Sequence, residues 1–527
     1  MVNKQRPLVI VVSIATVLGL TVAACGGGPQ ASLTVPESAK PGGLLLEPCT
    51  FKAEAGEYEA DCGSLVVQEN RDKVDSLLIA LPIIRVHANG SNPAEPIFFL
   101  DGGPGEDLNM RFKPPASLLA NHDFVMVGYR GVDGSSVLDC PEVSQAMKGV
   151  GGNLLSEESH ANLSDARARC AQRLQGAGVD LEGYTLPNMA ADMEAARAGL
   201  DYERVNLLAR GFGTRIAQID AYLYPDRIFR SALIGPGTPG HNMVFEPKTI
   251  DAQLETYARL CAEDVTCSAR TSDLAATMRN VTRNMPDRWL LFPIDTGKVR
   301  VGTFLLLKRT GNAAMVFDAY LAAEQGDPSG LVPLQLLYDI EVPITWVAWG
   351  DFYAKSGIDY DPSRDYAAEM DPPDSILGSP FSLLIWSGDL GWPMTSVPEE
   401  FRQVHPSDVQ TLLVTGSIDT RFPPEFATEE LLPYLTHVQQ VVVAEAGHEL
   451  LDVQPEAVER LLTSFYDTGV ADDSLYTYVP VNFQASPSAP ALAKIVLGIA
   501  LLIIAAVIAV TWLIIRRTRR RRTRRQL

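Results

Sequence analysis

The sequence predicts an α/β protein in which helices cover a mostly parallel β-sheet, with a membrane attachment at each end of the chain. Two observations support this prediction. Short runs rich in β-branched and aromatic residues alternate with helical stretches through most of the chain, which is typical of parallel strands joined by crossover helices. Apolar segments occupy residues 7–20 and 495–515. The composition, with 46% hydrophobic and 20% charged residues among 527, is that of a folded protein.

The first 25 residues are predicted to be an export signal of the bacterial lipoprotein type. Lys4 and Arg6 precede the apolar run, and small residues then lead to Cys25. A cysteine directly after Val-Ala-Ala resembles a lipobox, in which that cysteine receives a lipid and becomes the new N-terminus. An ordinary signal peptide and an uncleaved anchor helix are the alternatives. Residues 26–46 are rich in Gly and Pro and are expected to form a flexible tether.

Residues 495–515 are predicted to cross a membrane as a helix. They contain no charged residue, and at 1.5 Å per residue the helix is about 31 Å long, which matches a bilayer core of about 30 Å. The tail, residues 516–527, holds eight arginines and no acidic residue. The positive-inside rule therefore places the tail in the cytoplasm and the main domain outside the cytoplasmic membrane of a bacterium. A buried core helix is the alternative, although an arginine tail does not ordinarily follow one.

The charge distribution excludes nucleic acid as a ligand of the main domain. The chain has 44 Lys and Arg against 64 Asp and Glu. Eleven of the basic residues lie in the signal, at Lys494 or in the tail, so the body between the two ends has a net charge of −31. A body this acidic repels a phosphate backbone.

Six cysteines in the body predict disulfides, as expected for an exported protein. Their number is even and they form three sequence-local pairs, but six cysteines allow 15 connectivities and proximity alone does not decide among them. No His or carboxylate accompanies them at metal-ligand spacing, so we expect no metal site. The pairing suggested by proximity is Cys49 with Cys62, Cys140 with Cys170, and Cys261 with Cys267.

The pattern of elements divides the body into a core over residues 47–239 and 406–470, an insertion over residues 240–405, and a second linker over residues 471–494. The insertion is expected because the alternation of strands and helices is lost there and returns afterwards. We expect strands at residues 64–67, 77–87, 97–100, 124–129, 205–209, 229–234, 411–415 and 438–443. We expect helices at residues 158–175, 188–200, 215–224 and 455–466.

A glycine-rich loop follows one of the predicted strands. An apolar run ends at Asp101, and Gly102, Gly103, Pro104 and Gly105 come next. Glycine lets the backbone approach a ligand closely, and a loop after a sheet strand can aim backbone N–H groups at a developing oxyanion. A plain tight turn is the alternative.

Another strand turns into a helix at residues 209–213, Ala-Arg-Gly-Phe-Gly. A buried strand that passes through small residues into a helix is the layout of a nucleophile elbow. Its central position is Gly211, which has neither a hydroxyl nor a thiol. With the glycine-rich loop, the elbow would form an oxyanion hole from the backbone N–H groups of Gly102, Gly103 and Phe212.

Asp419 and His448 stand at the ends of two later predicted strands. Nucleophile, acid and histidine is the chain order of the catalytic triad in α/β hydrolases. Each residue alone could be a surface group at a strand end. In this order, and both at strand ends, they are predicted to be the acid and base positions of a triad.

These segments together resemble the proline iminopeptidase and tripeptidyl aminopeptidase family of secreted α/β hydrolases. The resemblance implies the α/β-hydrolase fold, a helical cap formed by the insertion, cleavage of N-terminal residues from short peptides, and no cofactor. The motifs that carry it are Asp61-Cys62-Gly63-Ser64, the Gly-Gly-Pro-Gly loop, Tyr129-Arg130-Gly131, the run from Tyr222 to Arg227, Gly391-Trp392-Pro393, Asp419 and Gly447-His448.

Departures from the family pattern decide the functional prediction. Family members carry Ser where this chain has Gly211 and often carry His where it has Asp101, and the small residues common after the loop are here Glu106 and Asp107. A triad histidine takes a proton from a hydroxyl so that the oxygen can attack, and a glycine offers neither. Other hydroxyls near the predicted loops, none of them on an elbow, belong to Thr214, Ser135, Ser136 and Ser417.

Three hypotheses follow from this pattern. The leading one is a catalytically degenerate hydrolase, held at the membrane by Cys25 and the C-terminal helix, that binds a peptide or small molecule. The second is an active aminopeptidase or esterase that uses Asp419 and His448 with water or an unrecognised nucleophile. The third is a structural or interaction scaffold whose cleft is filled by its own side chains, such as Arg210 or Trp392.

Overall fold

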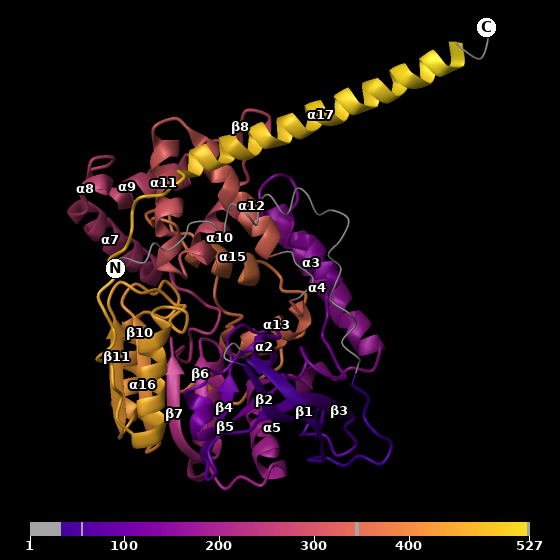
Figure 1. Ribbon diagram of the computed structural model, residues 1–527, viewed down its shortest axis with the longest axis vertical. Coiled ribbons are helices and arrows are strands. Elements are labelled where there is room, and N and C mark those ends of the chain that lie inside the picture. Colours follow the sequence, from indigo (N-terminus) through magenta and orange to yellow (C-terminus); the bar gives the residue numbers. More distant parts are fainter. Residues whose placement is uncertain (1–32, 54–55, 343–346, 524–527) are drawn as a thin grey trace.

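The computed structural model describes residues 33–53, 56–342 and 347–523, with side chains as far as residue 516. The predicted signal and its Cys25 lie outside these residues. Two layers are visible in Figure 1, with the sheet below, a helical region above it, and one long helix projecting from the top.

A nine-stranded sheet forms the centre of the described chain, in the order β1-β2-β3-β5-β4-β6-β7-β10-β11. From β5 to β11 in this order, every pair of adjacent strands is parallel. At the other edge, β1 pairs antiparallel with β2, β2 with β3, and β3 with β5. Every strand expected from the sequence is present. The bounds are β1 Leu44–Ala53, β2 Gly56–Gln68, β3 Leu78–Val86, β4 Ala94–Leu100, β5 His122–Val127, β6 Val205–Arg210, β7 Ile228–Ile234, β10 Gln410–Gly416 and β11 Val438–Val443.

Strand β1 was not expected, since residues 44–46, its first three, were predicted to belong to a flexible tether. It is a half-exposed edge strand that contains Pro48, which an edge tolerates because one side of the strand needs no hydrogen-bond donors. The disulfide between Cys49 and Cys62 joins β1 to β2. All three disulfides suggested by proximity are present, including Cys140–Cys170 and Cys261–Cys267.

Helices bury both faces of the parallel strands. Along β4, Phe98 and Leu100 pack in the same core as helices α5 and α6, whereas Ile97 and Phe99 pack on the opposite face with α16. Burial on both faces explains why these strands are continuous apolar runs in the sequence. The flanking helices are α3 Pro141–Ala146, α4 Glu157–Gly176, α5 Leu186–Gly199, α6 Gly213–Leu223 and α16 Pro455–Thr468, with the short α2 Leu108–Arg111 after the glycine-rich loop.

Between β7 and β10 the described residues form helices, connecting loops and one hairpin with two residues in each strand, β8 Arg288–Trp289 and β9 Phe292–Pro293. We refer to residues 240–405 as the cap. Figure 1 shows it above the sheet. Its helices are α7 Pro247–Glu263, α8 Val265–Ser268, α9 Leu274–Arg283, α10 Thr296–Leu306, α11 Ala313–Glu324, α12 Leu331–Glu341, α13 Trp349–Ser356, α14 Tyr366–Glu369 and α15 Pro380–Trp386.

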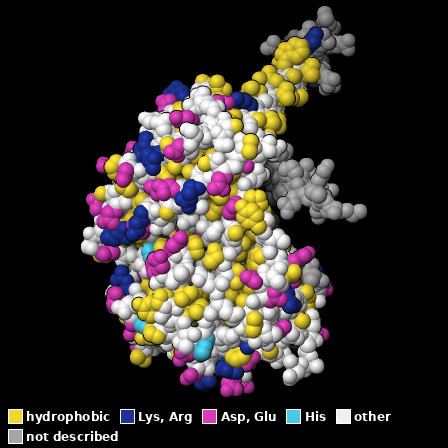
Figure 2. Space-filling model, turned by 90° about the vertical axis from the view of Figure 1, so that its left-hand side faces the viewer, with side chains coloured by type: hydrophobic (Ala, Val, Ile, Leu, Met, Phe, Trp, Pro, Cys, Tyr) yellow, Lys and Arg dark blue, Asp and Glu magenta, His cyan; other side chains and the backbone are white. Residues whose placement is uncertain are grey.

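The C-terminal helix α17, Ala489–Thr523, begins six residues before the predicted span and projects from the cap. By length and composition its residues Ala489–Arg516 could cross a membrane, and the apolar part of the helix is exposed. Figure 2 shows the projecting helix as an almost continuous hydrophobic surface, while the body carries mixed charges. Residues 471–488 form no helix or strand, yet Phe483 is buried and stacks on Phe317 of α11.

Candidate functional site

The turn between β6 and α6 places Gly211 at the carboxyl edge of the sheet in a left-handed conformation, with φ at 53°. Its backbone N–H donates to the carbonyl of Ile234, which fixes the turn against β7. A Cβ atom on Gly211 would lie 3.0 Å from Nε2 of His448. The elbow geometry of a hydrolase is therefore present, and glycine carries its positive φ without the strain that a side chain would add.

Asp419 and His448 are brought together by neighbouring strands. Asp419 follows β10 and His448 follows β11, and these two strands pair in parallel. Nδ1 of His448 lies 2.8 Å from Oδ2 of Asp419, which is fully buried. The other oxygen, Oδ1, accepts hydrogen bonds from the backbone N–H groups of Arg421 (2.8 Å) and Phe422 (3.1 Å). This contact orients the imidazole ring so that its Nε2 faces Gly211.

The glycine-rich loop also lies beside the elbow. A Cβ atom on Gly102 would be 3.6 Å from the backbone nitrogen of Phe212, and the three residues predicted to supply donors, Gly102, Gly103 and Phe212, line the same cavity. The N–H of Gly102, however, donates to Oδ1 of the buried Asp101 at 2.6 Å. Arg210 binds both oxygens of that carboxylate, at 2.7 and 2.8 Å. The carboxylate of Asp101 thus occupies the N–H of Gly102, one of the donors that an oxyanion would need.

The cap fixes the far end of the same loop through a buried ion pair. Asp351 and Lys355 of α13 are fully buried and lie 2.6 Å apart. Oδ2 of Asp351 accepts from the N–H of Gly105 at 3.0 Å, and the ammonium of Lys355 donates to the carbonyl of Arg130 at 2.7 Å. The loop is therefore held between the sheet and the cap by charged hydrogen bonds.

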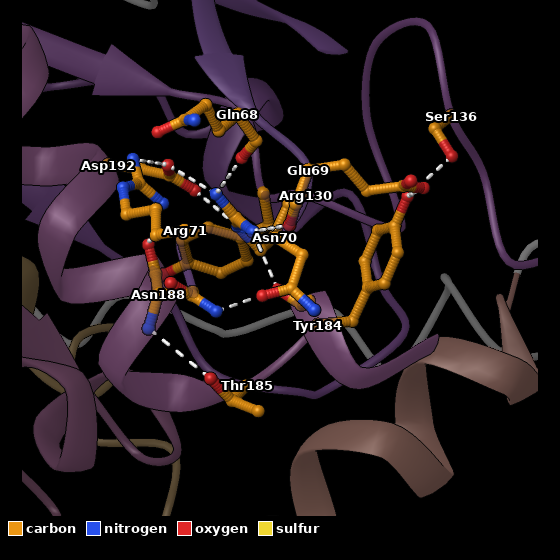
Figure 3. Close-up of polar contacts among 12 residues, drawn as sticks. Gln68, Glu69, Asn70, Arg71, Arg130, Ser136, Tyr184, Thr185, Asn188 and Asp192 are labelled. Carbon is orange, nitrogen blue, oxygen red and sulfur yellow. Dashed lines mark hydrogen bonds and ion pairs between the residues drawn. The ribbon is translucent and has the colours of Figure 1, made fainter. Parts of the chain in front are cut away.

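Arg130 is the centre of a buried polar cluster behind this loop, shown in Figure 3. Its guanidinium binds both oxygens of Asp192 at 2.7 Å and donates to the carbonyls of Glu69 and Gly183 at 2.6 Å. The neighbouring Tyr129 donates its hydroxyl to the carbonyl of Asp101 at 3.1 Å. The Tyr-Arg-Gly motif of the sequence therefore supports the loop structurally and does not face the site.

A small cavity opens beside His448, with a volume of about 90 Å³. It adjoins a more apolar cavity of about 140 Å³ under the cap, with Phe245 and Met243 in the wall between them. Among the described lining residues of the first cavity there is no Ser, Thr, Cys or Tyr. Its lining consists of Asp101, Gly102, Gly103, Glu106, Leu108, Arg210, Gly211, Phe212, Met243, Phe245, Lys308, Arg421, Phe422, His448 and Glu449.

Two family models match the chain. Residues 95–293 match the α/β hydrolase fold, and residues 386–475 match the TAP-like protein family. These segments contain the elbow, the loop and the Asp–His pair. The chain belongs to the α/β-hydrolase family.

The curated relatives of this α/β-hydrolase-family protein include peptidases. The tripeptidyl aminopeptidase of Streptomyces coelicolor is 23% identical over 46% of this chain and 46% of its own length. The serine protease Hip1 of Mycobacterium tuberculosis is 25% identical over 39% of this chain and 42% of its own length. The chain thus aligns with less than half the length of these curated relatives. An esterase from Exiguobacterium antarcticum, a solved structure, shows 14% identity and a TM-score of 0.34 over 75% of this chain and 97% of its own.

Around the cavity of this hydrolase-family protein, one carboxylate has no partner of opposite charge. Glu106 is half-buried and its backbone N–H donates to the carbonyl of Gly103 at 3.4 Å, but within the part of the chain that the structure describes its carboxylate makes no hydrogen bond or ion pair. Burial raises the pKa of Glu106, although Lys308 and Arg421 oppose the shift. Burial also acts to raise the pKa of Glu449, but the positive charges of His448, Lys308 and Arg210 outweigh it and bring that pKa down to about 2.

The other hydroxyls considered as nucleophiles are engaged elsewhere. Thr214 donates its hydroxyl to the carbonyl of Gly211 at 2.5 Å and accepts from the N–H of Gly237. Ser135 accepts from the N–H of Ala80, and Ser417 accepts from the N–H of Glu445. Ser136 bonds to the hydroxyl of Tyr184. Trp392 is buried in the cap against Tyr353 and does not line the cavity.

Several charged residues of the site were not assigned a role from the sequence. Arg210 and Glu449 are direct neighbours of Gly211 and His448, so their positions beside the motifs were a usable signal. Lys308 lies in the cap, where its backbone carbonyl accepts from the N–H of His448 at 2.8 Å, and no local pattern marks it. Among the described residues, no group of three or more His, Cys, Asp or Glu side chains is placed to hold a metal ion.

Proposed function

We propose that this protein binds the amino terminus of a peptide, or a small amine, in a hydrolase site that has lost its nucleophile. The observation that carries the proposal is the complete Asp419–His448 pair. Nε2 of His448 faces Gly211 and would lie 3.0 Å from a Cβ atom at that residue. A histidine that has no hydroxyl to deprotonate cannot generate the usual acyl-enzyme.

The charges of the cavity favour a cation near the glycine-rich loop. The carboxylate of Glu106 lies against Gly103, where a Cβ atom would be 3.3 Å from its Cδ. The carboxylate of Asp101 is paired with Arg210, whereas that of Glu106 is unpaired among the described residues, so an ammonium group would be stabilised beside Glu106. The adjoining apolar cavity, lined by Leu305, Trp349 and Phe381 among others, could hold the first side chain of a bound peptide.

The proposal also includes the place of the protein in the cell. Helix α17 would cross the cytoplasmic membrane, with the arginine tail inside and the body outside, because positive residues stay on the cytoplasmic side. A lipid on Cys25 would provide a second attachment. Three disulfides in the body suit an oxidising, extracytoplasmic location.

The binding test uses the full-length chain in detergent micelles and isothermal titration calorimetry with tripeptides that carry free or acetylated amino termini. We expect binding of free peptides without turnover, and weaker binding of acetylated ones. Glu106→Gln should weaken binding of free peptides about tenfold, since a hydrogen bond to a charged group contributes about 1.5 kcal/mol or more. The matched control is Asp107→Asn, because Asp107 pairs with Arg111 outside the cavity. Equal affinity for free and acetylated peptides would contradict the ammonium site.

The intact acid–base pair favours one alternative function, an active aminopeptidase or esterase that uses His448 with water or another nucleophile. Such an enzyme would show turnover whose pH profile follows the ionisation of His448. His448→Ala would abolish that turnover. Turnover of this kind by the natural protein would overturn the proposal of a degenerate site.

A further inference from the structure

An apolar groove lies between the cap and the first turns of α17. Its volume is about 550 Å³, and apolar side chains make up most of its wall. The hairpin β8–β9 and helix α12 form one side, and Val496, Leu497 and Ala500 of α17 form the other. Figure 1 shows β8 and α12 beside the base of the projecting helix. The carboxylate at its edge, Asp339, is paired with Lys298 at 2.7 Å.

The hairpin that borders this groove carries leucines where a soluble protein carries turn residues. Leu290 and Leu291 form its two-residue turn and are 63% and 95% exposed. Asn, Asp and Gly are favoured at such positions because the turn requires a positive φ, and Leu290 has φ at 55°. A bulky apolar residue in this conformation is uncommon. The tip of the hairpin is therefore strained, apolar and exposed to solvent.

Helix α12 adds a second exposed apolar surface next to this tip. Leu336 and Ile340 are 44% and 42% exposed and stand four residues apart, so they share one face of the helix. Phe292, the first residue after the turn, is 42% exposed. These side chains line the groove together with Trp289. The cap thus presents a contiguous apolar surface at the point where α17 leaves it.

The start of α17 is fixed to the cap, so the cap and the helix have a set orientation. The N–H of Ala489 donates to Asp318 of α11 at 2.6 Å, and Lys494 pairs with Asp327 at 2.7 Å. Two groove residues of α17, Leu492 and Ala493, precede Lys494. The other three, Val496, Leu497 and Ala500, follow it by two to six positions, which is about 3–9 Å along the helix axis at 1.5 Å per residue. Apolar faces of interfacial helices lie about 5–10 Å deep at the boundary of headgroups and acyl chains, which is a similar depth.

We propose that the groove and the Leu290–Leu291 tip bind the acyl chains of lipids in the outer leaflet of the membrane that α17 crosses. The proposal rests on the proposed membrane span, since only that span brings lipid to the groove. The lipid surface is continuous with the exposed apolar face of α17. The cap then lies against the bilayer, and helix α10 connects the two regions, because Leu306 lines the groove and Leu305 lines the apolar cavity near His448.

The test measures contact between the hairpin tip and lipid in the full-length chain. The chain carries Cys25→Ser, which removes any acyl group of its own, and one added cysteine labelled with an environment-sensitive fluorophore. It is reconstituted in nanodiscs of phosphatidylcholine with or without acyl chains brominated near the headgroup. Leu291→Cys is the test position. Val265→Cys, on α8 at the left of the cap in Figure 1, is 85% exposed and serves as the control outside the membrane.

A third position separates this proposal from the membrane span on which it rests. Leu502→Cys lies on the exposed apolar part of α17, where Leu502 is 71% exposed. We expect brominated lipid to quench the labels at residues 291 and 502 and to leave the label at residue 265 unchanged. Quenching at 502 without quenching at 291 would overturn the lipid groove and keep the span. No quenching at 502 would overturn the span itself.

Discussion

The two halves of the candidate site match the predicted catalytic triad to different degrees. In the acid–base half, Asp419 keeps both backbone hydrogen bonds and its contact with His448 at 2.8 Å. In the nucleophile half, Gly211 has no side chain, and Asp101 takes the N–H of Gly102 and the guanidinium of Arg210. The backbone of the elbow and the Asp419–His448 contact are thus formed in a chain that has no side chain at residue 211.

A structural reason for this asymmetry lies in how each half is held. The acid and base stand at the ends of two parallel strands, so the sheet itself keeps them together. The glycine-rich loop depends instead on side-chain charges, among them the fully buried pair Asp351–Lys355. Breaking one pair on each side should therefore have unequal effects.

The largest expected effect comes from Lys355→Met. It leaves the carboxylate of Asp351 buried without its partner, and removing one member of a buried ion pair costs about 3–5 kcal/mol. We expect the free energy of unfolding, measured by denaturant titration, to fall by that amount. The matched control is Lys355→Met with Asp351→Leu, in which no charge remains unpaired and most of the loss should be recovered. A single variant as stable as the natural protein would show that the loop does not depend on this pair.

The next effect concerns Glu449, which lies between the two halves, 3.8 Å from Arg210 and next in sequence to His448. Its pKa of about 2 is below the ordinary value of 4.5, so the unfolded chain takes up the proton first as the pH falls. The stabilisation is complete above about pH 4.5 and is lost as the pH falls towards 2, with a total of about 2–3 kcal/mol.

Glu449→Gln removes this titrating group. We expect the variant to be less stable than the natural protein at pH 7 and the difference to shrink between pH 4.5 and 2, as followed by thermal unfolding at several pH values. A difference that stays constant over this range would exclude the carboxylate charge as its cause. Asp452→Asn is a control at a more exposed carboxylate that pairs with Arg309.

A smaller effect is expected from Asp101 once a nucleophile is present. In a Gly211→Ser background, Asp101→Ala frees the N–H of Gly102 for an oxyanion and should raise the rate of ester hydrolysis about tenfold, less than the roughly 100-fold or more that one oxyanion-hole donor contributes in a complete active site. Asp107→Ala in the same background is the control. An unchanged rate would mean that Gly102 contributes no hydrogen bond to the reaction even when it is free.

The sequence predicted the parts of the fold that depend on local patterns. Strands buried on both faces give apolar runs, so β4, β6, β7 and β10 were located from composition alone. The approach of Asp419 to His448 followed from their positions at the ends of successive strands. The edge strand β1 was missed because it is half-exposed and contains Pro48. The hydropathy of the last segment predicted a membrane span but not the contacts that fix the start of α17 to the cap.

The charged part of the site could not be predicted because its partners are distant in sequence. Asp101 and Arg210 are 109 residues apart. Lys308, in the turn after α10, and Lys355, in α13, come from parts of the cap whose placement depends on tertiary packing. The resemblance to the aminopeptidase family placed Asp101 at a position where members often carry histidine. It did not show that the carboxylate turns onto the N–H of Gly102.

The most direct test of a disarmed site compares the full-length natural protein with Gly211→Ser and Gly211→Ser/His448→Ala under a fluorophosphonate probe. A Cβ atom at residue 211 meets Nε2 of His448 at 3.0 Å, so the ring must shift by a few tenths of an ångström to accept serine. We predict no labelling of the natural protein and labelling of Gly211→Ser at residue 211, about 100-fold or more faster than in the double variant, since a general base contributes at least that factor. Labelling of the natural protein would contradict the account, and the modified residue would identify its nucleophile.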